Sequence, residues 1–121
     1  MTKMTTEEAF VKVLQKHGIS NAFGIIGSAM MPISDLFPSA GISFWDAAHE
    51  GNAGMMADGY TRATGEMSMM VAQNGPGITN FVTPVKTAYW NHTPLLLVTP
   101  QAANKTIAVS YTHLTLPTTE A

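Results

Sequence analysis

The 121-residue sequence contains no cysteine, a single arginine and few charged residues of either sign. Without cysteine, the chain can form neither a disulfide framework nor a thiolate metal site. Its five lysines are scattered and its net charge is -2, so we expect no nucleic acid as a partner. No apolar run approaches the roughly 20 residues that cross a bilayer, and the N-terminal MTKMTTEEAF lacks the apolar core of a signal peptide. We therefore expect a cytoplasmic protein that has no membrane partner.

The composition is apolar for a soluble domain. Hydrophobic residues make up 45% of the chain and charged residues only 12%, against about 25% charged in an average domain. The length suits one domain with its own core. We expect other domains or subunits to cover much of its surface, although a small, poorly charged domain would have the same composition.

Helix and strand signals alternate along the chain. Thr5 or Thr6 can cap a first helix that ends at Gly18, with Glu7 and Glu8 at its positive N-terminal end. The predicted helices cover 5–18 (with Phe10, Val13, Leu14 and His17 on one face), 32–36, 50–63 and 78–90, the last despite Pro84. The predicted strands cover 21–26, 42–48, 67–72 and 94–99.

These strands are apolar on both faces, which is typical of a parallel sheet covered by helices on either side. The predicted fold class is therefore α/β, with ligands gathering at the carboxyl ends of the strands. The residues at those ends are Gly27-Ser28, His49-Glu50, Asn74-Gly75-Pro76-Gly77 and Pro100-Gln101.

Most motifs for common chemistries are missing from these strand ends. The sequence has no phosphate-binding Gly-x-x-x-x-Gly-Lys-Ser/Thr, and Asn80 occupies the third glycine position of a dinucleotide fingerprint. It has no Gly-x-Ser-x-Gly elbow and no histidine pair at metal-ligand spacing. Nucleotide-binding, hydrolase and zinc functions are disfavoured.

Glu50 is the one carboxylate at these ends. It could be an ordinary acid at a helix N-terminus, worth about 0.3–1 kcal/mol. However, small residues follow it, and the nearby apolar side chains are Phe44, Trp45, Met55 and Met56. Burial among them would raise the pKa of Glu50, which would suit a carboxyl that shares a proton with a heterocycle nitrogen.

The segment HEGNAGMMADGYTRATG resembles a signature of thiamine-diphosphate-dependent enzymes of the acetolactate synthase and pyruvate oxidase superfamily. FGIIGSAMMPI and NGPGITN resemble two further blocks of that superfamily, in the same order. The resemblance covers Met4 to about Ile107. It implies a flavodoxin-like pyrimidine-binding domain, present here in truncated form.

The resemblance also implies roles for individual residues. The glutamate aligned with Glu50 hydrogen-bonds a pyrimidine nitrogen of thiamine diphosphate, which favours the imino tautomer that deprotonates the thiazolium carbon. The further implied cofactor-binding residues are Gly75, Pro76 and Gly77 at the pyrimidine, and Gly27 and Ser28 beside the reacting carbon. The weaker candidates for substrate contact are Asn74, His92, Gln101 and His49.

Two segments resemble the sequences of a branch of acetyltransferases that act on sulfoacetaldehyde: FGIIGSAMMPISDLFP and AYWNHTPLLLVTPQAANKTI. This implies sulfoacetaldehyde and phosphate as substrates, with acetyl phosphate and sulfite as products. An acetolactate-synthase-like enzyme and a noncatalytic flavodoxin-like interaction module remain as alternatives.

The motif Gly-Asp-Gly...Asn, which holds Mg²⁺ and the diphosphate in the superfamily, is absent from this sequence. We therefore expect no metal ligand in this chain. The resemblance implies a homo-oligomer, a dimer or tetramer, in which a second subunit supplies the diphosphate-binding domain. We expect this chain to be inactive alone.

The C-terminal sequence changes character after Ile107. We interpret 1–108 as part of the pyrimidine-binding domain and 109–121 as a non-native read-through tail. The segment from Val109 to Thr118 resembles the translation of an adapter used in preparing sequencing libraries, although its composition also suits a strand. No function is assigned to Tyr111 or His113.

Overall fold

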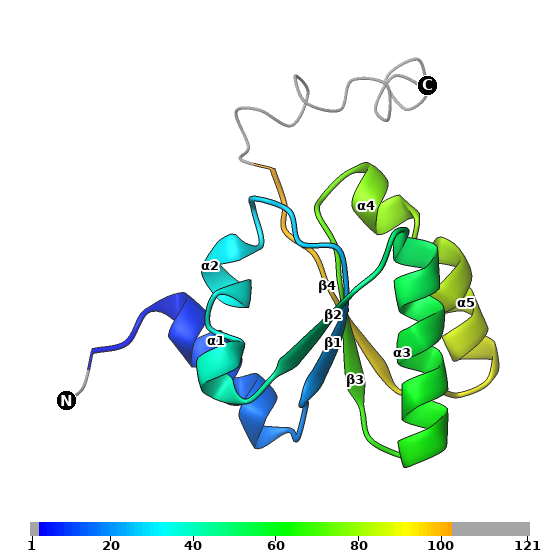
Figure 1. The fold of residues 1–121 in the computed structure, drawn as a ribbon, viewed down its shortest axis with the longest axis horizontal. Coiled ribbons are helices and arrows are strands. Elements are labelled where there is room, and N and C mark those ends of the chain that lie inside the picture. The colour runs from blue at the N-terminus through cyan, green and yellow to red at the C-terminus, as the bar shows by residue number, and fades with distance from the viewer. Residues whose placement is uncertain (1–2, 103–121) are drawn as a thin grey trace, which may run out of the picture.

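The computed structural model describes residues 3–102 as alternating helices and short strands (Figure 1). The predicted tail, 109–121, lies outside the described residues. The elements are α1 (Thr6–Lys16), β1 (Asn21–Gly24), α2 (Met31–Ser34), the 3₁₀ helix η1 (Pro38–Ala40), β2 (Ser43–Asp46), α3 (Glu50–Thr64), β3 (Ser68–Val71), α4 (Pro76–Thr79), α5 (Val82–Trp90) and β4 (Leu95–Val98). Within residues 3–102, no helix has the length and apolar character needed to cross a membrane.

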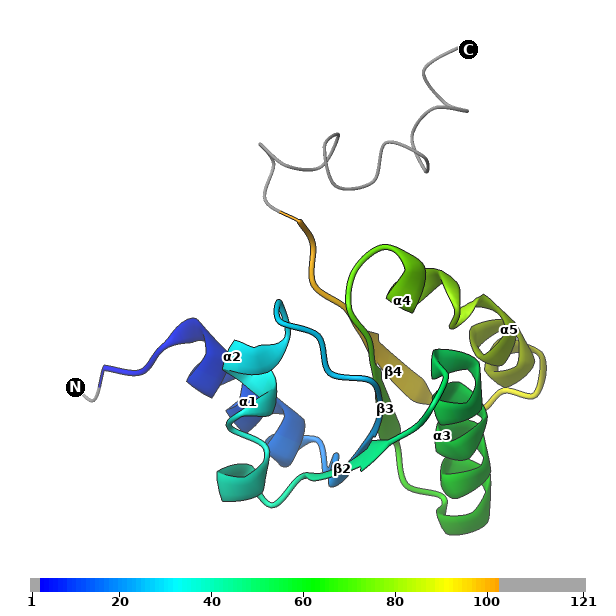
Figure 2. The ribbon, with the colours of Figure 1, turned by 45° about the horizontal axis from the view of Figure 1, so that its top comes forward.

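The four strands form one parallel sheet in the order β2-β1-β3-β4. Helices α1 and α2 lie on one face of it, and α3 and α5 lie on the other (Figures 1 and 2). This arrangement confirms the predicted α/β class with helices on both faces. The chain leaves the adjacent strands β1 and β3 toward opposite faces of the sheet (Figure 1). In open parallel sheets, ligands bind outside the carboxyl ends of such a pair of strands.

Two apolar cores pack against the two faces of the sheet. One contains Val11 and Leu14 of α1 together with Met69 and Val71 of β3. The other contains Ala53 and Ala57 of α3 together with Met70 of β3. Because side chains alternate along a strand, three successive residues of β3 serve both cores. All four residues of β3 are buried.

Helix α1 begins as its sequence predicts. The hydroxyl of Thr5 accepts from the Glu8 backbone, and the Glu8 carboxylate accepts from the Thr5 backbone, which completes a capping box. Gly18 adopts φ 73° after the helix. The predicted face is shifted, however: Val11 and Leu14 are buried, whereas Val13 and His17 are exposed.

The helix predicted over 78–90 is two helices, α4 and α5. Phe81 lies between them and is fully buried. Pro84 is the third residue of α5, where a backbone N–H would have no partner within the helix, so the missing N–H costs little. The chain therefore turns at residues 80–81 and begins a new helix that accommodates the proline.

The expectation that every strand is buried on both faces is wrong for the two edge strands. Three of the four residues of β2 are exposed, and all four residues of β4 are only half-buried. Trp45 of β2 is 50% exposed, and its indole N–H donates to Asn21 Oδ1 at 2.8 Å. β2 and β4 are edge strands because each pairs with a neighbouring strand on one side only. Their apolar composition alone did not distinguish them from central strands.

Candidate functional site

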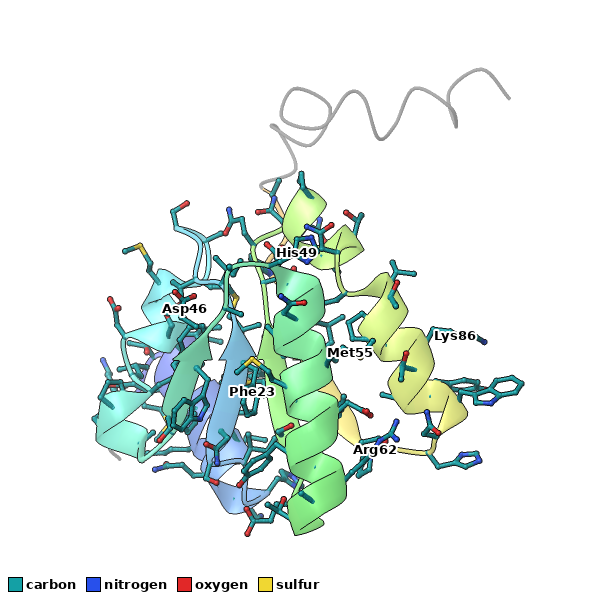
Figure 3. All side chains as sticks on the ribbon, turned by 45° about the vertical axis from the view of Figure 1, so that its right-hand side comes forward. Phe23, Asp46, His49, Met55, Arg62 and Lys86 are labelled. Carbon is teal, nitrogen blue, oxygen red and sulfur yellow. The ribbon has the colours of Figure 1, made fainter. Side chains whose placement is uncertain are left out.

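The loops that follow the four strands lie at one edge of the sheet, together with α4 (Figure 1). Helix α3 begins at this edge, and the labelled His49 marks its start, whereas Arg62 lies toward the opposite end of the helix (Figure 3). The carboxyl ends of the strands therefore bring most of the predicted site residues together, as a parallel sheet requires.

Glu50 is the first residue of α3. His49 is the N-cap, with extended backbone angles, and its Nδ1 accepts from the Gly51 backbone N–H at 3.0 Å. The imidazole thereby pairs one of the free N–H groups at the helix start. His49, a candidate for substrate contact from the sequence, therefore also has a structural function as the cap of α3.

The Glu50 carboxylate is half-buried and makes a long-range hydrogen bond. Asn80 Nδ2 donates to Glu50 Oε2 at 2.9 Å, joining residues thirty positions apart. Within residues 3–102, three of the four apolar side chains expected around Glu50 are exposed: Trp45 is 50% exposed and Met55 and Met56 are each 41% exposed. The two methionines do not pack against the sheet, because the buried face of α3 consists of other residues, among them Ala53, Gly54 and Ala57.

The segment Gly75-Pro76-Gly77 passes beside Glu50. Gly75 has φ 75° and ψ −125°, a conformation that glycine adopts readily, and Pro76 begins α4. A β-carbon on the buried Gly77 would lie 3.6 Å from Glu50 Oε1 and 3.4 Å from the Ala72 β-carbon. A side chain there would fill the space next to the carboxylate, so these glycines fit the close approach of a flat ring.

Gln73 also belongs to this region, although it was not predicted from the sequence. Its side-chain Oε1 accepts from the Ala29 backbone N–H at 3.2 Å and so links the loop after β1 to the loop after β3. A β-carbon on Gly27 would come within 2.3 Å of the same oxygen. Gly27 therefore has a packing role against Gln73, and Ser28 next to it is exposed. Gln73 directly follows the strand predicted over 67–72, and this position could have indicated that it lies at the site.

The four candidates for substrate contact do not all reach this edge. His49 and Asn74 lie there, and the exposed Gln101 follows β4 at the same edge. His92 lies between the end of α5 and the start of β4, which places it at the amino ends of the strands. Its φ of 56° reflects the turn there. The structure therefore does not bring His92 to the candidate site.

Residues 3–102 contain no group of three or more histidine, aspartate or glutamate residues that could hold a metal ion. In this part of the chain, the site offers the Glu50 carboxylate, the His49 imidazole, amide side chains and glycine backbone. Such groups can bind a neutral heterocycle, and a carboxylate can share a proton with one of its nitrogens.

Comparison with known proteins points to one family. The chain matches the N-terminal TPP binding domain of thiamine pyrophosphate enzymes over residues 4–118. It is 86% identical over 105 residues to the sulfoacetaldehyde acetyltransferase of Roseovarius nubinhibens, covering 87% of this chain and 17% of that protein. It is 38% identical over 103 residues to the acetolactate synthase of Arthrospira platensis, covering 82% of this chain and 18% of that protein.

A solved structure is also similar. It is that of the thiamine diphosphate-dependent 4-hydroxybenzoylformate decarboxylase of Rhodococcus jostii, with a TM-score of 0.79 at 27% identity, covering 88% of this chain and 20% of that one. The chain spans less than a fifth of the length of the two curated relatives. The match over residues 4–118 and the 86% identity confirm the resemblance seen in the sequence. The chain belongs to the family of N-terminal TPP-binding domains of thiamine pyrophosphate enzymes.

Proposed function

We propose that this chain is the N-terminal segment of a thiamine-diphosphate-dependent acetyltransferase that converts sulfoacetaldehyde and phosphate to acetyl phosphate and sulfite. The observation that carries the proposal is the 86% identity to an enzyme of that name over 105 residues. The identity to the acetolactate synthase is 38% over a similar length. This difference favours the acetyltransferase over the acetolactate-synthase-like alternative.

The net reaction needs no external oxidant or reductant. The C–S bond of sulfoacetaldehyde breaks and sulfite leaves with the electron pair of that bond. The former sulfonate-bearing carbon becomes a methyl group, and the aldehyde carbon becomes an acyl carbon bonded to a phosphate oxygen. The oxidation of one carbon thus balances the reduction of the other, and one proton is released.

Glu50 is the proposed acid–base residue of this chain. Its Oε2 is engaged by Asn80, and its Oε1 faces the β-position of Gly77 at 3.6 Å. Oε1 can therefore hold the proton that is shared with a ring nitrogen of a bound pyrimidine. Glu50 would keep that proton in place while the chemistry proceeds elsewhere on the cofactor.

Gly75, Pro76 and Gly77 would hold the pyrimidine by backbone contact, and Gly27 and Ser28 would lie beside the reacting part of the cofactor. Thiamine diphosphate, when bound, supplies the nucleophilic carbon and the electron sink that this chemistry needs. Within the described edge of the sheet, Asn74, Gln101 and His49 are the proposed substrate contacts. His92 is not included, because it lies at the other edge.

The proposed enzyme requires parts beyond this chain. Residues 3–102 offer no cluster of metal ligands, so we assign Mg²⁺ and the diphosphate to a further domain, contributed by a second subunit of a homo-oligomer. The exposed apolar side chains of α5 suit contact with further protein: Val82 is 66% exposed, Tyr89 73% and Trp90 75%. The segment alone should have no activity.

The test is to purify the full-length protein and measure two reactions separately. Sulfite release from sulfoacetaldehyde, dependent on both phosphate and thiamine diphosphate, is the expected result. Condensation of pyruvate without sulfite release would instead favour the acetolactate-synthase-like function. If the protein binds no thiamine diphosphate and performs neither reaction, the noncatalytic interaction module is favoured.

A further inference from the structure

We propose that Asn80 is a positioning residue that fixes the Glu50 carboxylate and determines which of its two oxygens carries the catalytic proton. The inference rests on the proposed function of Glu50. It concerns the hydrogen bond from Asn80 Nδ2 to Glu50 Oε2 at 2.9 Å, the one side-chain partner recorded for Glu50 within residues 3–102.

Asn80 is itself held firmly at the corner between α4 and α5. Its backbone N–H donates to Pro76 O at 3.2 Å. The next residue, Phe81, is fully buried and packs against the start of α3: a β-carbon on Gly54 would lie 3.0 Å from its ring. The break between the two helices therefore places the Asn80 side chain over the first turn of α3.

The glycines of α3 allow this close approach. A β-carbon on Gly51 would lie 3.6 Å from the Asn80 carbonyl oxygen, and one on Gly54 would lie 2.4 Å from Pro84. A side chain at position 54 would push the corner away from α3, whereas the contact at position 51 is at an ordinary van der Waals distance. Gly54 thus serves the Glu50–Asn80 hydrogen bond as well as helix packing.

The chemistry of the two side chains makes the hydrogen bond directional. The amide nitrogen of asparagine only donates, and an ionised carboxylate only accepts. When Glu50 takes up a proton, the amide N–H still needs an accepting oxygen, and the unprotonated oxygen accepts better than the hydroxyl. Oε2 therefore remains the acceptor for Asn80, and the proton resides on Oε1, the oxygen that faces Gly77.

The test compares Asn80→Ala and Asn80→Leu with wild type in the full-length protein. The measured quantity is hydrogen–deuterium exchange at the thiazolium carbon of bound thiamine diphosphate, at saturating cofactor, by quenched-flow NMR. Because a hydrogen bond to a charged group is at stake, we expect exchange to slow by about 10- to 100-fold in both variants. Asn80→Gln, which keeps an amide donor, should recover part of the rate.

A double-mutant cycle separates positioning from a general structural effect. If Asn80 acts through Glu50, adding Asn80→Ala to Glu50→Gln should slow exchange little further than Glu50→Gln alone. Crystal structures of the cofactor-free proteins give an independent readout: the Glu50 carboxylate should be displaced from its wild-type position in Asn80→Ala. The matched control is Asn91→Ala, because the Asn91 side chain donates to Thr87 O at the far end of α5.

The outcomes are distinguishable. Unchanged exchange in the Asn80 variants, with slow exchange in Glu50→Gln, would overturn the positioning role and leave the proposed function intact. Additive effects in the cycle would also overturn it. If wild type itself neither binds thiamine diphosphate nor exchanges the proton, the proposed function fails first.

Discussion

Gly24 and Val71 are in such close contact that a β-carbon on Gly24 would lie 1.8 Å from the Val71 carbonyl oxygen. The two residues are partners at the carboxyl ends of β1 and β3, the central strands of the sheet. The Ile25 backbone N–H donates to the same oxygen at 3.2 Å. The carboxyl ends of β1 and β3, beside the candidate site, therefore meet at a point where only glycine fits.

We predict that Gly24→Ala lowers the stability of the full-length protein. The clash is with backbone, so β1 and β3 would have to separate, at a cost of about 1–3 kcal/mol or more. The measurement is the midpoint of thermal unfolding, which should fall by several degrees.

Gly59→Ala is the matched control. Gly59 is an exposed residue of α3 whose β-carbon would have no neighbour within 4 Å. Alanine is favoured over glycine inside a helix by about 1 kcal/mol, so this variant should unfold at the same temperature or higher. Equal losses of stability in the two variants would contradict the assigned packing of Gly24.

The sequence predicted the order and type of the elements because the signals there are local. Thr5 and Glu8 favour the start of a helix and Gly18 favours its end, whatever the rest of the fold. Short apolar runs between such helices are typical of a parallel sheet. What could not be predicted depends on contacts across the fold. The exposed faces of β2 follow from its place at the edge, and the break before α5 follows from burial of Phe81.

The same distinction holds at the candidate site. A parallel sheet gathers the residues after its strands, so Glu50 and Gly77 were predicted to lie together, and a β-carbon on Gly77 would be 3.6 Å from Glu50 Oε1. Gln73 and Asn80 were not predicted as site residues, because their roles depend on which loops meet. The prediction that placed His92 at the site was wrong, because a histidine near a strand in the sequence does not indicate at which end of the strand it lies.

We predict that Glu50→Gln abolishes most cofactor activation without disturbing the fold. Glutamine keeps the size of the side chain but cannot exchange a proton with a ring nitrogen. Exchange of the thiazolium proton should slow by about 10²–10⁴-fold, the usual range for a general acid–base residue. Glu66→Gln is the control, because Glu66 accepts from Tyr60 near the C-terminal end of α3. Equal exchange rates in the two variants would count against a catalytic role for Glu50.

Gly77→Ala should weaken cofactor binding more than it weakens the fold. Its β-carbon would make ordinary contacts at 3.4–3.6 Å with Ala72, Gln73 and Glu50, so the backbone need not move. The methyl group would occupy space proposed for the pyrimidine, and we expect the Kd for thiamine diphosphate to rise about tenfold, equivalent to 1.4 kcal/mol. Titration calorimetry measures the Kd, and thermal unfolding without cofactor should be nearly unchanged. A large loss of stability with an unaltered Kd would reassign Gly77 to packing.

The last prediction concerns the ion pair on α3, far from the candidate site. Arg62 Nη2 lies 2.8 Å from Asp58 Oδ2, and the Asp58 side chain is only 8% exposed, whereas that of Arg62 is 45% exposed. The other Asp58 oxygen, Oδ1, is buried and has no hydrogen-bond partner among the described residues. Arg62→Met would leave a buried carboxylate without its cation, and we expect a loss of about 1–3 kcal/mol, below the cost for a fully buried pair because Arg62 is half in solvent.

Two comparisons make this prediction specific. Asp58→Asn combined with Arg62→Met removes both charges, so the double variant should be more stable than Arg62→Met alone. Lys86→Met removes an exposed cation that lies over the rings of Tyr89 and Trp90 at 5.1 and 5.8 Å, and it should change stability by only about 0.5 kcal/mol. Chemical denaturation of the full-length protein measures all three. If the Arg62 and Lys86 variants lose the same stability, the Asp58 carboxylate does not depend on its pairing with Arg62.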